Sequence, residues 1–350
     1  MRHSNVKFFT GLLFLVTILV LALPAPAAII FQYETTLDLD LGAVGRSLPT
    51  HVSCDPATGE VCVTDTRQTA LHVLTAAHVQ VMRTSPLASI QWPSSGAIAP
   101  DGTLLYVDTR NGRTFTVSHL DIFGEPAPLA LEAPGGDWNP TLLTVLPDGD
   151  LLTLDPADGR LARHDLATGG LRWTMQVGDA DARDTHFGRP ALGPDGRIYV
   201  PGGEQRRVFI VTADGRADGM FGRFGSTVGR MALPVGVACG PGGTLLVLDR
   251  MRAKILVFGT DLAFVSEFGT AGARAGQFYH PADIAASNDR LIYVAQGYLG
   301  RVQVFHVFDS QSEGGEMSMS SAAAQVVDRI VLGGAGTDRA AMRSFPATRP

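Results

Sequence analysis

Cysteine and charge are both scarce in this sequence of 350 residues. Three cysteines without a CxxC or CxxCH motif exclude a fold built on disulfides and a covalently attached c-type haem. Only 18% of the residues are charged and 45% are hydrophobic, a balance that excludes an intrinsically disordered chain. The composition is that of a compact protein.

Uninterrupted helical stretches are lacking too. The chain contains 40 glycines and 21 prolines, and each of these costs a helix interior about 1 or 3 kcal/mol, respectively. The apolar residues also do not recur every 3.6 residues, as a helical solenoid requires. We therefore predict an all-β protein that is rich in turns.

A long apolar run, residues 8–23, lies near the N-terminus. It follows Arg2 and Lys7 and precedes Ala25-Pro26-Ala27, a small-x-small pattern that signal peptidase cleaves. Its 16 residues are fewer than the roughly 20 that span a bilayer. We predict a signal peptide over residues 1–28, cleaved near Ala27, export to the periplasm or the exterior, and no membrane span after cleavage. An uncleaved membrane anchor is the alternative.

Export would permit disulfides. Cys54 and Cys62 flank one tight turn and could bridge neighbouring strands, or all three cysteines, with Cys239, could be buried free thiols. The sequence leaves both alternatives open.

The formal charge of −6 becomes −8 once Arg2 and Lys7 are removed, and Lys254 is then the last lysine. An acidic chain is a poor ligand for nucleic acids and anionic membranes. The partner predicted from charge is therefore a protein, without nucleic acid.

A turn recurs along the chain at a fixed interval. Pro-Asp-Gly stands at residues 100–102, 147–149 and 194–196, each 47 residues after the last. Related turns follow at 241–243 and 288–290, and an earlier one includes Thr58-Gly59. Regular self-similarity of this length marks a repeat architecture, here with six copies.

Each copy contains four short β-rich runs. An apolar run, usually led by proline, enters the turn, and runs such as VCVTD, LLYVD and LIYVA leave it. A third run (RVFIV, KILVF, RVQVF) and a fourth follow. Four antiparallel strands per repeat are typical of a propeller blade. We predict a six-bladed β-propeller.

Residues 268–305, FGTAGARAGQFYHPADIAASNDRLIYVAQGYLGRVQVF, resemble an NHL repeat, and the other copies are weaker versions. The resemblance covers roughly residues 35–308. It implies a six-bladed propeller of the secreted bacterial type. It implies little about function, because the NHL family includes binding platforms as well as enzymes.

The resulting domain division is a signal peptide (1–28), a propeller (29–310), and a linker with a C-terminal tail (311–350). Residues 35–42, TTLDLDLG, read as an orphan fourth strand that would pair with RVQVF of the sixth copy and close the ring. Residues 325–334, QVVDRIVLGG, are the rival for this position.

Charged residues recur at two equivalent positions of most copies, and we call each such set of equivalent positions a column. Because they recur, they are expected to serve each blade rather than one site. We predict that they cap the turn between the second and third strands through Asx bonds or ion pairs. The acidic column consists of Asp65, Asp108, Asp155 and Asp249, and the basic one of Arg113, Arg160, Arg207, Lys254 and Arg301.

Polar residues that break the symmetry are the better candidates for a site. Those near the starts of the inner strands, at the mouth of the channel, are predicted to bind a ligand: His51, Ser95, Thr141, Arg189 and Asp283. A second candidate is a divalent metal site, for Zn or Ca, at His51, His186 and His280, since imidazole and carboxylate suit such ions.

Two hypotheses about function remain. No catalytic residue is predicted for either of them, apart from the metal ligands named above. The first is a non-catalytic, exported protein-binding platform or accessory subunit of an envelope complex, with no cofactor. It is favoured because no nucleophile–base motif and no phosphate-binding glycine loop is found. The second is a metal-dependent enzyme. A resemblance to the peptidylglycine amidating lyases and the six-bladed lactonases implies it, with histidines of separate blades holding zinc.

Overall fold

The computed structural model describes residues 29–39, 47–84, 90, 92–110, 114–120, 125–178 and 187–309. The predicted signal peptide, the C-terminal tail and the rival closing strand at residues 325–334 lie outside the described residues. In the part of the chain that is described, no helix has the length and apolar character needed to cross a membrane.

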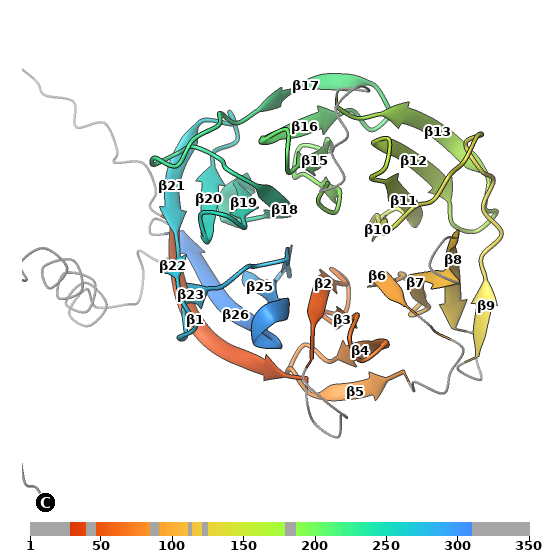
Figure 1. Cartoon of the computed structure of the whole chain (residues 1–350), viewed down its shortest axis with the longest axis horizontal. Coiled ribbons are helices and arrows are strands. Elements are labelled where there is room, and N and C mark those ends of the chain that lie inside the picture. Colours follow the sequence, from red (N-terminus) through yellow and green to blue (C-terminus); the bar gives the residue numbers. More distant parts are fainter. Residues whose placement is uncertain are drawn as a thin grey trace, which may run out of the picture.

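Six four-stranded antiparallel sheets form a closed ring (Figure 1), so the predicted all-β, six-bladed propeller is confirmed. Blades 1 to 3 consist of β2 (Pro49–Cys54), β3 (Val61–Asp65), β4 (Ala70–Leu74) and β5 (Gln80–Arg83); β6 (Pro93–Ile98), β7 (Leu104–Arg110), β8 (Thr114–Leu120) and β9 (Pro126–Pro128); and β10 (Leu142–Val145), β11 (Asp150–Asp155), β12 (Arg160–Asp165) and β13 (Leu171–Gln176).

Blades 4 to 6 follow in chain order: β14 (Ala191–Leu192), β15 (Ile198–Gly202), β16 (Arg207–Val211) and β17 (Ala217–Phe221); β18 (Pro234–Cys239), β19 (Leu245–Asp249), β20 (Lys254–Phe258) and β21 (Phe264–Phe268); and β24 (Asp283–Ala286), β25 (Leu291–Gln296), β26 (Arg301–Asp309) and β1 (Ile29–Asp38). Two 3-10 turns, η1 (Pro241–Gly243) and η2 (Gly297–Leu299), and a short parallel pair, β22 (Thr270–Ala271) and β23 (Gln277–Phe278), complete the set.

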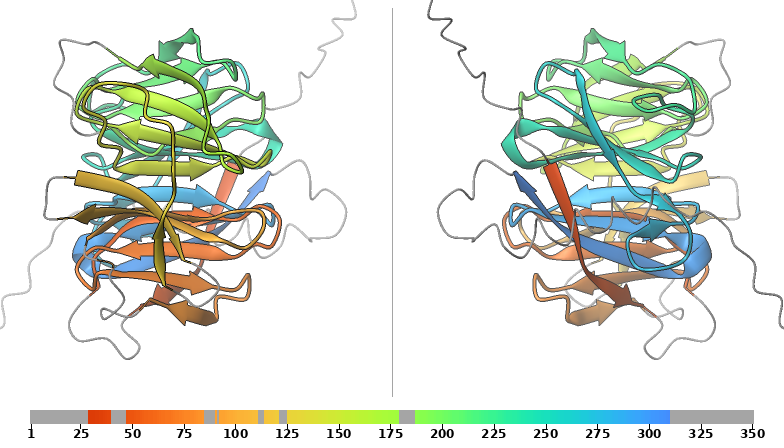
Figure 2. Two further views of the ribbon diagram at one scale, coloured as in Figure 1. Left: turned by 90° about the vertical axis from the view of Figure 1, so that its right-hand side faces the viewer. Right: turned by 90° about the vertical axis from the view of Figure 1, so that its left-hand side faces the viewer.

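The N-terminal strand closes the ring. β1 pairs antiparallel with β26 along its whole length, as the side views in Figure 2 show. The predicted N-terminal closure is therefore confirmed, although the strand begins at Ile29 rather than at residue 35. Phe31 of β1 stacks on Phe268 of the preceding blade with ring centroids 4.7 Å apart, so the closing strand also packs against its neighbour.

The second strands are apolar on both faces because each blade lies between two others. All residues of β3, β11, β15 and β19 are buried. Each pair of neighbouring blades shares an apolar cluster, for example Leu246 and Ile255 of blade 5 with Ile292 of blade 6. This continuous packing explains why these runs lack the alternation of a half-exposed strand.

The repeated turn depends on its glycine. Gly102, Gly149 and Gly196 have φ of +85°, +85° and +78°, a region that L side chains rarely adopt. Each donates its N–H to the carbonyl three residues earlier, at 2.8, 3.0 and 3.1 Å. The turn reverses the chain between the first and second strands.

The two faces of the ring carry different loops. We call the face at which the inner strands begin the upper face; it holds the loops between blades and the turns between second and third strands. The opposite, lower face holds the turns between first and second and between third and fourth strands.

Candidate functional site: a polar layer in the channel

One residue from each blade lies two positions after the proline column that opens the inner strands, with Phe187 in place of proline in blade 4. We call these six residues the channel layer: His51, Ser95, Leu142, Arg189, Gly236 and Asp283. Four of them come from the predicted binding set, and three of these, His51, Arg189 and Asp283, break the symmetry of the repeat with charge or a titratable ring.

Arg189 and Asp283 form a buried ion pair between blades 4 and 6. Nε of Arg189 lies 3.1 Å from Oδ2 of Asp283, and the two side chains are 10% and 2% exposed. Nη2 of Arg189 donates to the carbonyls of Val52 and Ile284 at 2.8 and 3.2 Å. The backbone N–H groups of Val52 and Ile284 donate to the Asp283 carboxylate at 3.1 and 2.8 Å. Both charges are therefore paired and hydrogen-bonded, as burial requires.

The pair crosses blade 5, which contributes no side chain at this level. Gly236 forms a β-bridge with Arg189. A Cβ at Gly236 would lie 2.9 Å from Cγ2 of Ile284 and 3.1 Å from Oδ1 of Asp283. Glycine therefore leaves the space through which the two charged side chains meet.

His51 lies beside this pair from blade 1. Burial lowers its pKa to about 4; the carboxylate of Asp283 opposes this decrease and the guanidinium of Arg189 adds to it. Nδ1 is buried and has no hydrogen-bond partner among the described residues. At neutral pH the ring is uncharged, and the layer keeps its charge in Arg189 and Asp283.

The other two predicted binding residues make local contacts. Ser95 is buried, and its hydroxyl accepts a 3.3 Å hydrogen bond from the backbone of Leu143. Thr141 precedes β10 and its carbonyl accepts a bond from Ser94 at 2.8 Å. The structure thus brings His51, Arg189 and Asp283 together, whereas Ser95 and Thr141 hold neighbouring inner strands.

The three histidines of the metal hypothesis have different surroundings. His51 belongs to the channel layer, and His186 lies outside the described residues. His280 is exposed, with its ring 4.8 Å from Tyr279 and 4.9 Å from Tyr298. Within the described ranges, no group of three or more His, Cys, Asp or Glu residues is arranged to hold a metal ion.

The alternative of a Cys54–Cys62 disulfide is wrong, because both residues are free thiols, as is Cys239. The register of β2 and β3 places Cys62 opposite Ser53 and Cys54 opposite Val61. Adjacent residues of a strand point to opposite faces of the sheet, so the two sulfurs lie on different sides. Burial raises the pKa of Cys54 and Cys62 to about 12.

The aspartates of the acidic column hold loops of their own blades in place. Asp65 accepts hydrogen bonds from the N–H groups of Leu48 and Gln68. The same arrangement recurs at Asp155, with Asn139 and Ala157, and at Asp249, with Ala232, Leu233 and Arg252, while Asp108 accepts a bond from Trp92. Each carboxylate thus holds the loop that enters the inner strand, and in three blades it also caps the turn after the second strand.

The residues of the basic column each make a different contact. Arg160 pairs with Asp158, and Lys254 lies 3.8 Å from Glu267. Arg207 contacts Sδ of Met220, and Arg301 donates to the carbonyl of Arg274. Arg113 lies outside the described residues. These contacts run to partners other than the acidic column.

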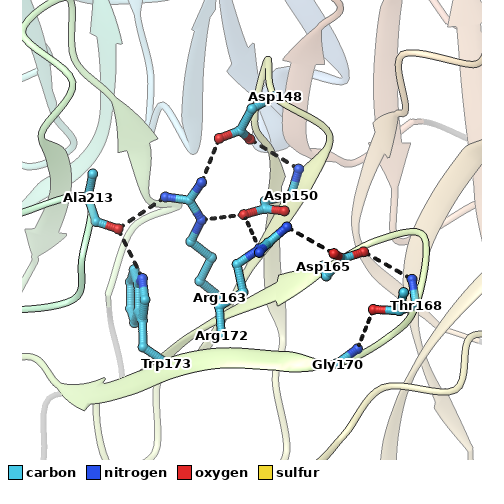
Figure 3. A network of polar contacts seen from close by, with 9 residues as sticks. All are labelled: Asp148, Asp150, Arg163, Asp165, Thr168, Gly170, Arg172, Trp173 and Ala213. Atoms are coloured by element: carbon cyan, nitrogen blue, oxygen red, sulfur yellow. Dashed lines mark hydrogen bonds and ion pairs between the residues drawn. The ribbon is translucent and has the colours of Figure 1, made fainter.

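A polar network joins blades 3 and 4 on the lower face (Figure 3). Arg163 lies 2.5 Å from Asp148 and 2.6 Å from Asp150, and it also donates to the carbonyl of Ala213 at 3.1 Å. Trp173 donates to the same carbonyl at 3.0 Å, and Arg172 binds Asp150 at 2.7 Å. The shared Asp150 carboxylate holds the two arginines within blade 3, and the carbonyl of Ala213, which accepts from both Arg163 and Trp173, links the network to blade 4.

Sequence reasoning did not single out Gly236 or the aromatic residues of the upper face. The signal for the channel layer was present: counting two positions from the proline column places His51, Arg189 and Asp283 in one ring. The absence of a side chain in blade 5 is equally visible in that column. No pattern in the neighbouring sequence indicates that Tyr279 and Tyr298 are exposed.

Comparison with curated proteins gives one partial match. Over 80 residues the chain is 38% identical to RING finger protein nhl-1 of Caenorhabditis elegans, and this match covers 23% of the chain and 8% of that protein. No protein-family model matches. The match thus spans only a small part of that protein's length and of this chain, and it supports the resemblance to NHL repeats in part.

Solved structures share the architecture. An auxiliary nutrient binding protein from Bacteroides ovatus is 15% identical with a TM-score of 0.59, covering 81% of this chain and 77% of that chain. A catalytically inactive virginiamycin B lyase from Staphylococcus aureus with quinupristin is 15% identical with a TM-score of 0.54, covering 73% and 80%. At this identity the likeness is one of fold.

Proposed function

We propose that this chain is an exported, non-catalytic propeller that docks a partner protein on its upper face, as a binding platform or an accessory subunit of an envelope complex. The observation that carries the proposal is the set of large apolar side chains exposed there. They lie in loops between blades or in turns after the second strands: Trp92, Phe224, Val228, Met251, Tyr279 and Tyr298.

These side chains are the kinds that dominate protein interfaces. Tyr298 is 71% exposed, Met251 69% and Phe224 65%. Tyr279 and Tyr298 contact each other edge to face at 6.2 Å. Tyrosine, tryptophan, methionine and arginine are enriched where proteins bind, and a propeller gains nothing in its own core from exposing them.

The charge on the two faces favours an acidic partner. Among the described residues, the upper-face loops contain more arginines than acids: Arg67, Arg206, Arg223, Arg230, Arg250 and Arg274, besides Arg252, which is paired with Glu267, against Glu132, Asp137, Asp158 and Glu204. The described residues of the lower-face turns are the reverse: Asp55, Glu60, Asp101, Glu125, Asp148, Asp195, Asp214, Asp261 and Asp289 against Arg197, Arg216 and Arg290. Complementary charge would orient the partner on the upper face.

Arginine and aromatic groups also meet directly on this face. The guanidinium of Arg206 lies 4.3 Å from the ring centroid of Phe224. An arginine stacked in this way loses little freedom when it binds a carboxylate. A nucleic acid is disfavoured as the partner by the net charge of the whole chain.

The likeness in fold to an auxiliary nutrient binding protein supports a binding role for an exported propeller of this kind. The enzyme alternative has weaker support. In the channel layer the Asp283 carboxylate accepts three hydrogen bonds, which leaves it a poor general base.

The test is quantitative capture from the envelope fraction of the producing cell. One variant combines Phe224→Ser, Met251→Ser and Tyr298→Ser. The matched control combines Val79→Ser, Val81→Ser and Val265→Ser, which removes three exposed apolar groups away from the upper face. We expect a partner that is retained by the control and reduced at least tenfold by the upper-face variant, with elution by salt. Equal capture by both variants would overturn the proposal.

A further inference from the structure

A cavity of about 560 Å³ occupies the lower end of the central channel. All six blades line it with the last residues of their inner strands and the turns that follow. Its volume is in the range of small-molecule sites, about 300–1,000 Å³. It lies on the opposite side of the channel layer from the upper face, so it is separate from the proposed protein-docking surface.

The repeat itself makes this cavity wide. Four positions after the proline column, every blade has a small residue: Ser53, Ala97, Thr144, Ala191, Ala238 and Ala285. All six line the cavity. The next position adds apolar groups, including Ile98, Val145 and Leu192. The walls are thus suited to an alkyl or aromatic body rather than to a sugar or a phosphate.

The inner end of the cavity carries the guanidinium of the Arg189–Asp283 ion pair. Arg189 lines it while belonging to the channel layer. Its described hydrogen bonds use Nε and Nη2, toward Asp283, Val52 and Ile284. Nη1 makes none of these bonds, so its two N–H donors are available on a side chain that the fold already holds in place.

The polar groups around Arg189 do not compete for these donors. The carboxylate of Asp283 is occupied by Nε of Arg189 and by two backbone N–H groups. The hydroxyls of Ser53 and Thr144 donate to the carbonyls of Gly96 and Pro190. At the outer rim, Asp55 accepts bonds from Ala57 and Thr58. An anion could therefore reach Nη1 without displacing an existing partner.

We propose that this cavity binds a small amphipathic carboxylate, such as a medium-chain fatty acid. The carboxylate accepts hydrogen bonds from Nη1 of Arg189, and the apolar chain lies among the small residues toward the lower face. Charge-assisted bonds of this kind are roughly twice as strong as bonds between neutral groups. This site does not depend on the upper-face proposal, because its ligand, face and residues differ.

The first test uses the unmodified mature chain and three probes in titration calorimetry: decanoate, decanol and decylamine. We expect decanoate to bind with one-to-one stoichiometry and at least tenfold more tightly than decanol, with decylamine weakest. Equal affinity for the three probes, or several weak sites, would overturn the proposal, since either result indicates unspecific adsorption of the alkyl chain.

Two variants locate the site. Ala238→Phe fills the cavity and should weaken decanoate at least tenfold, whereas Ala263→Phe, at an exposed turn before β21, should leave binding unchanged. Arg189→Gln should reduce the affinity for decanoate to that for decanol. Full binding by Ala238→Phe would place the ligand elsewhere and overturn the proposal, even if Arg189→Gln fails to fold.

Discussion

The guanidinium of Arg189 reaches the carboxylate of Asp283 across a whole blade, from the inner strand of blade 4 to that of blade 6, with a nitrogen–oxygen distance of 3.1 Å. The backbone of Val52, in blade 1, binds both members of the pair. Three blades are therefore joined at one level of the channel, and this level separates the proposed docking face from the lower cavity.

Removing one member of this pair should destabilise the fold strongly. Asp283→Asn leaves the Arg189 charge buried without compensation, and we expect a loss of about 3–5 kcal/mol in the free energy of unfolding. Urea unfolding followed by circular dichroism measures it. The double variant Arg189→Met/Asp283→Asn should recover part of the loss. A single variant as stable as the unmodified chain would show that the pair contributes nothing.

Adding one methyl group to blade 5 should disturb the same pair. In Gly236→Ala the new Cβ would lie 2.9 Å from Ile284 and 3.1 Å from Asp283. We expect a loss of about 1–3 kcal/mol, as for other overpacked sites. Gly170→Ala is the control, because its Cβ would meet Thr168 at 3.3 Å and nothing closer. Equal effects of the two changes on urea unfolding would argue against a role for the space at Gly236.

The closing strand should matter more than the C-terminal tail. Deleting residues 29–38 exposes the edge of β26 and removes the stacking of Phe31 on Phe268. We expect a much lower melting temperature than after deletion of residues 311–350, measured by differential scanning calorimetry. A larger effect of the tail deletion would assign a structural role to the tail instead.

His51 should make stability fall in mild acid. Its pKa is lowered to about 4 in the folded chain, against an ordinary value of 6.5. Between pH 6.5 and 4 the unfolded chain binds this proton and the folded chain does not, so the free energy of unfolding decreases as the pH falls through this window. His51→Gln should show a shallower decrease in urea midpoints between pH 7 and 4. An identical pH profile in the variant would exclude His51 as the cause.

The fold was accessible from the sequence because strands and turns are set by local patterns that recur. Gly102 and its equivalents mark turns that need a positive φ, and the runs after them are apolar because they lie between blades. The closing strand was predicted for the same reason, since the repeat lacked one strand at its C-terminal end.

The site was less accessible because it depends on contacts between distant blades. His51 and His280 stand near the starts of two inner strands, yet one is in the channel layer and the other, with φ of +45°, lies outside against Tyr298. The pairing of Arg189 with Asp283 requires ring closure and an empty position in blade 5. The Cys54–Cys62 disulfide is wrong because the register of the hairpin places the two side chains on opposite faces of the sheet. The spacing of the two cysteines in the sequence does not reveal that register.

The most direct measurement is site-specific photo-crosslinking in the producing cell. Benzoylphenylalanine replaces Tyr298 on the upper face in one variant and Val79 in a lower-face turn in the other; both positions are exposed, at 71% and 60%. We expect a discrete crosslinked protein of acidic composition from position 298 and none from position 79. A crosslink from position 79 with none from position 298 would contradict docking on the upper face.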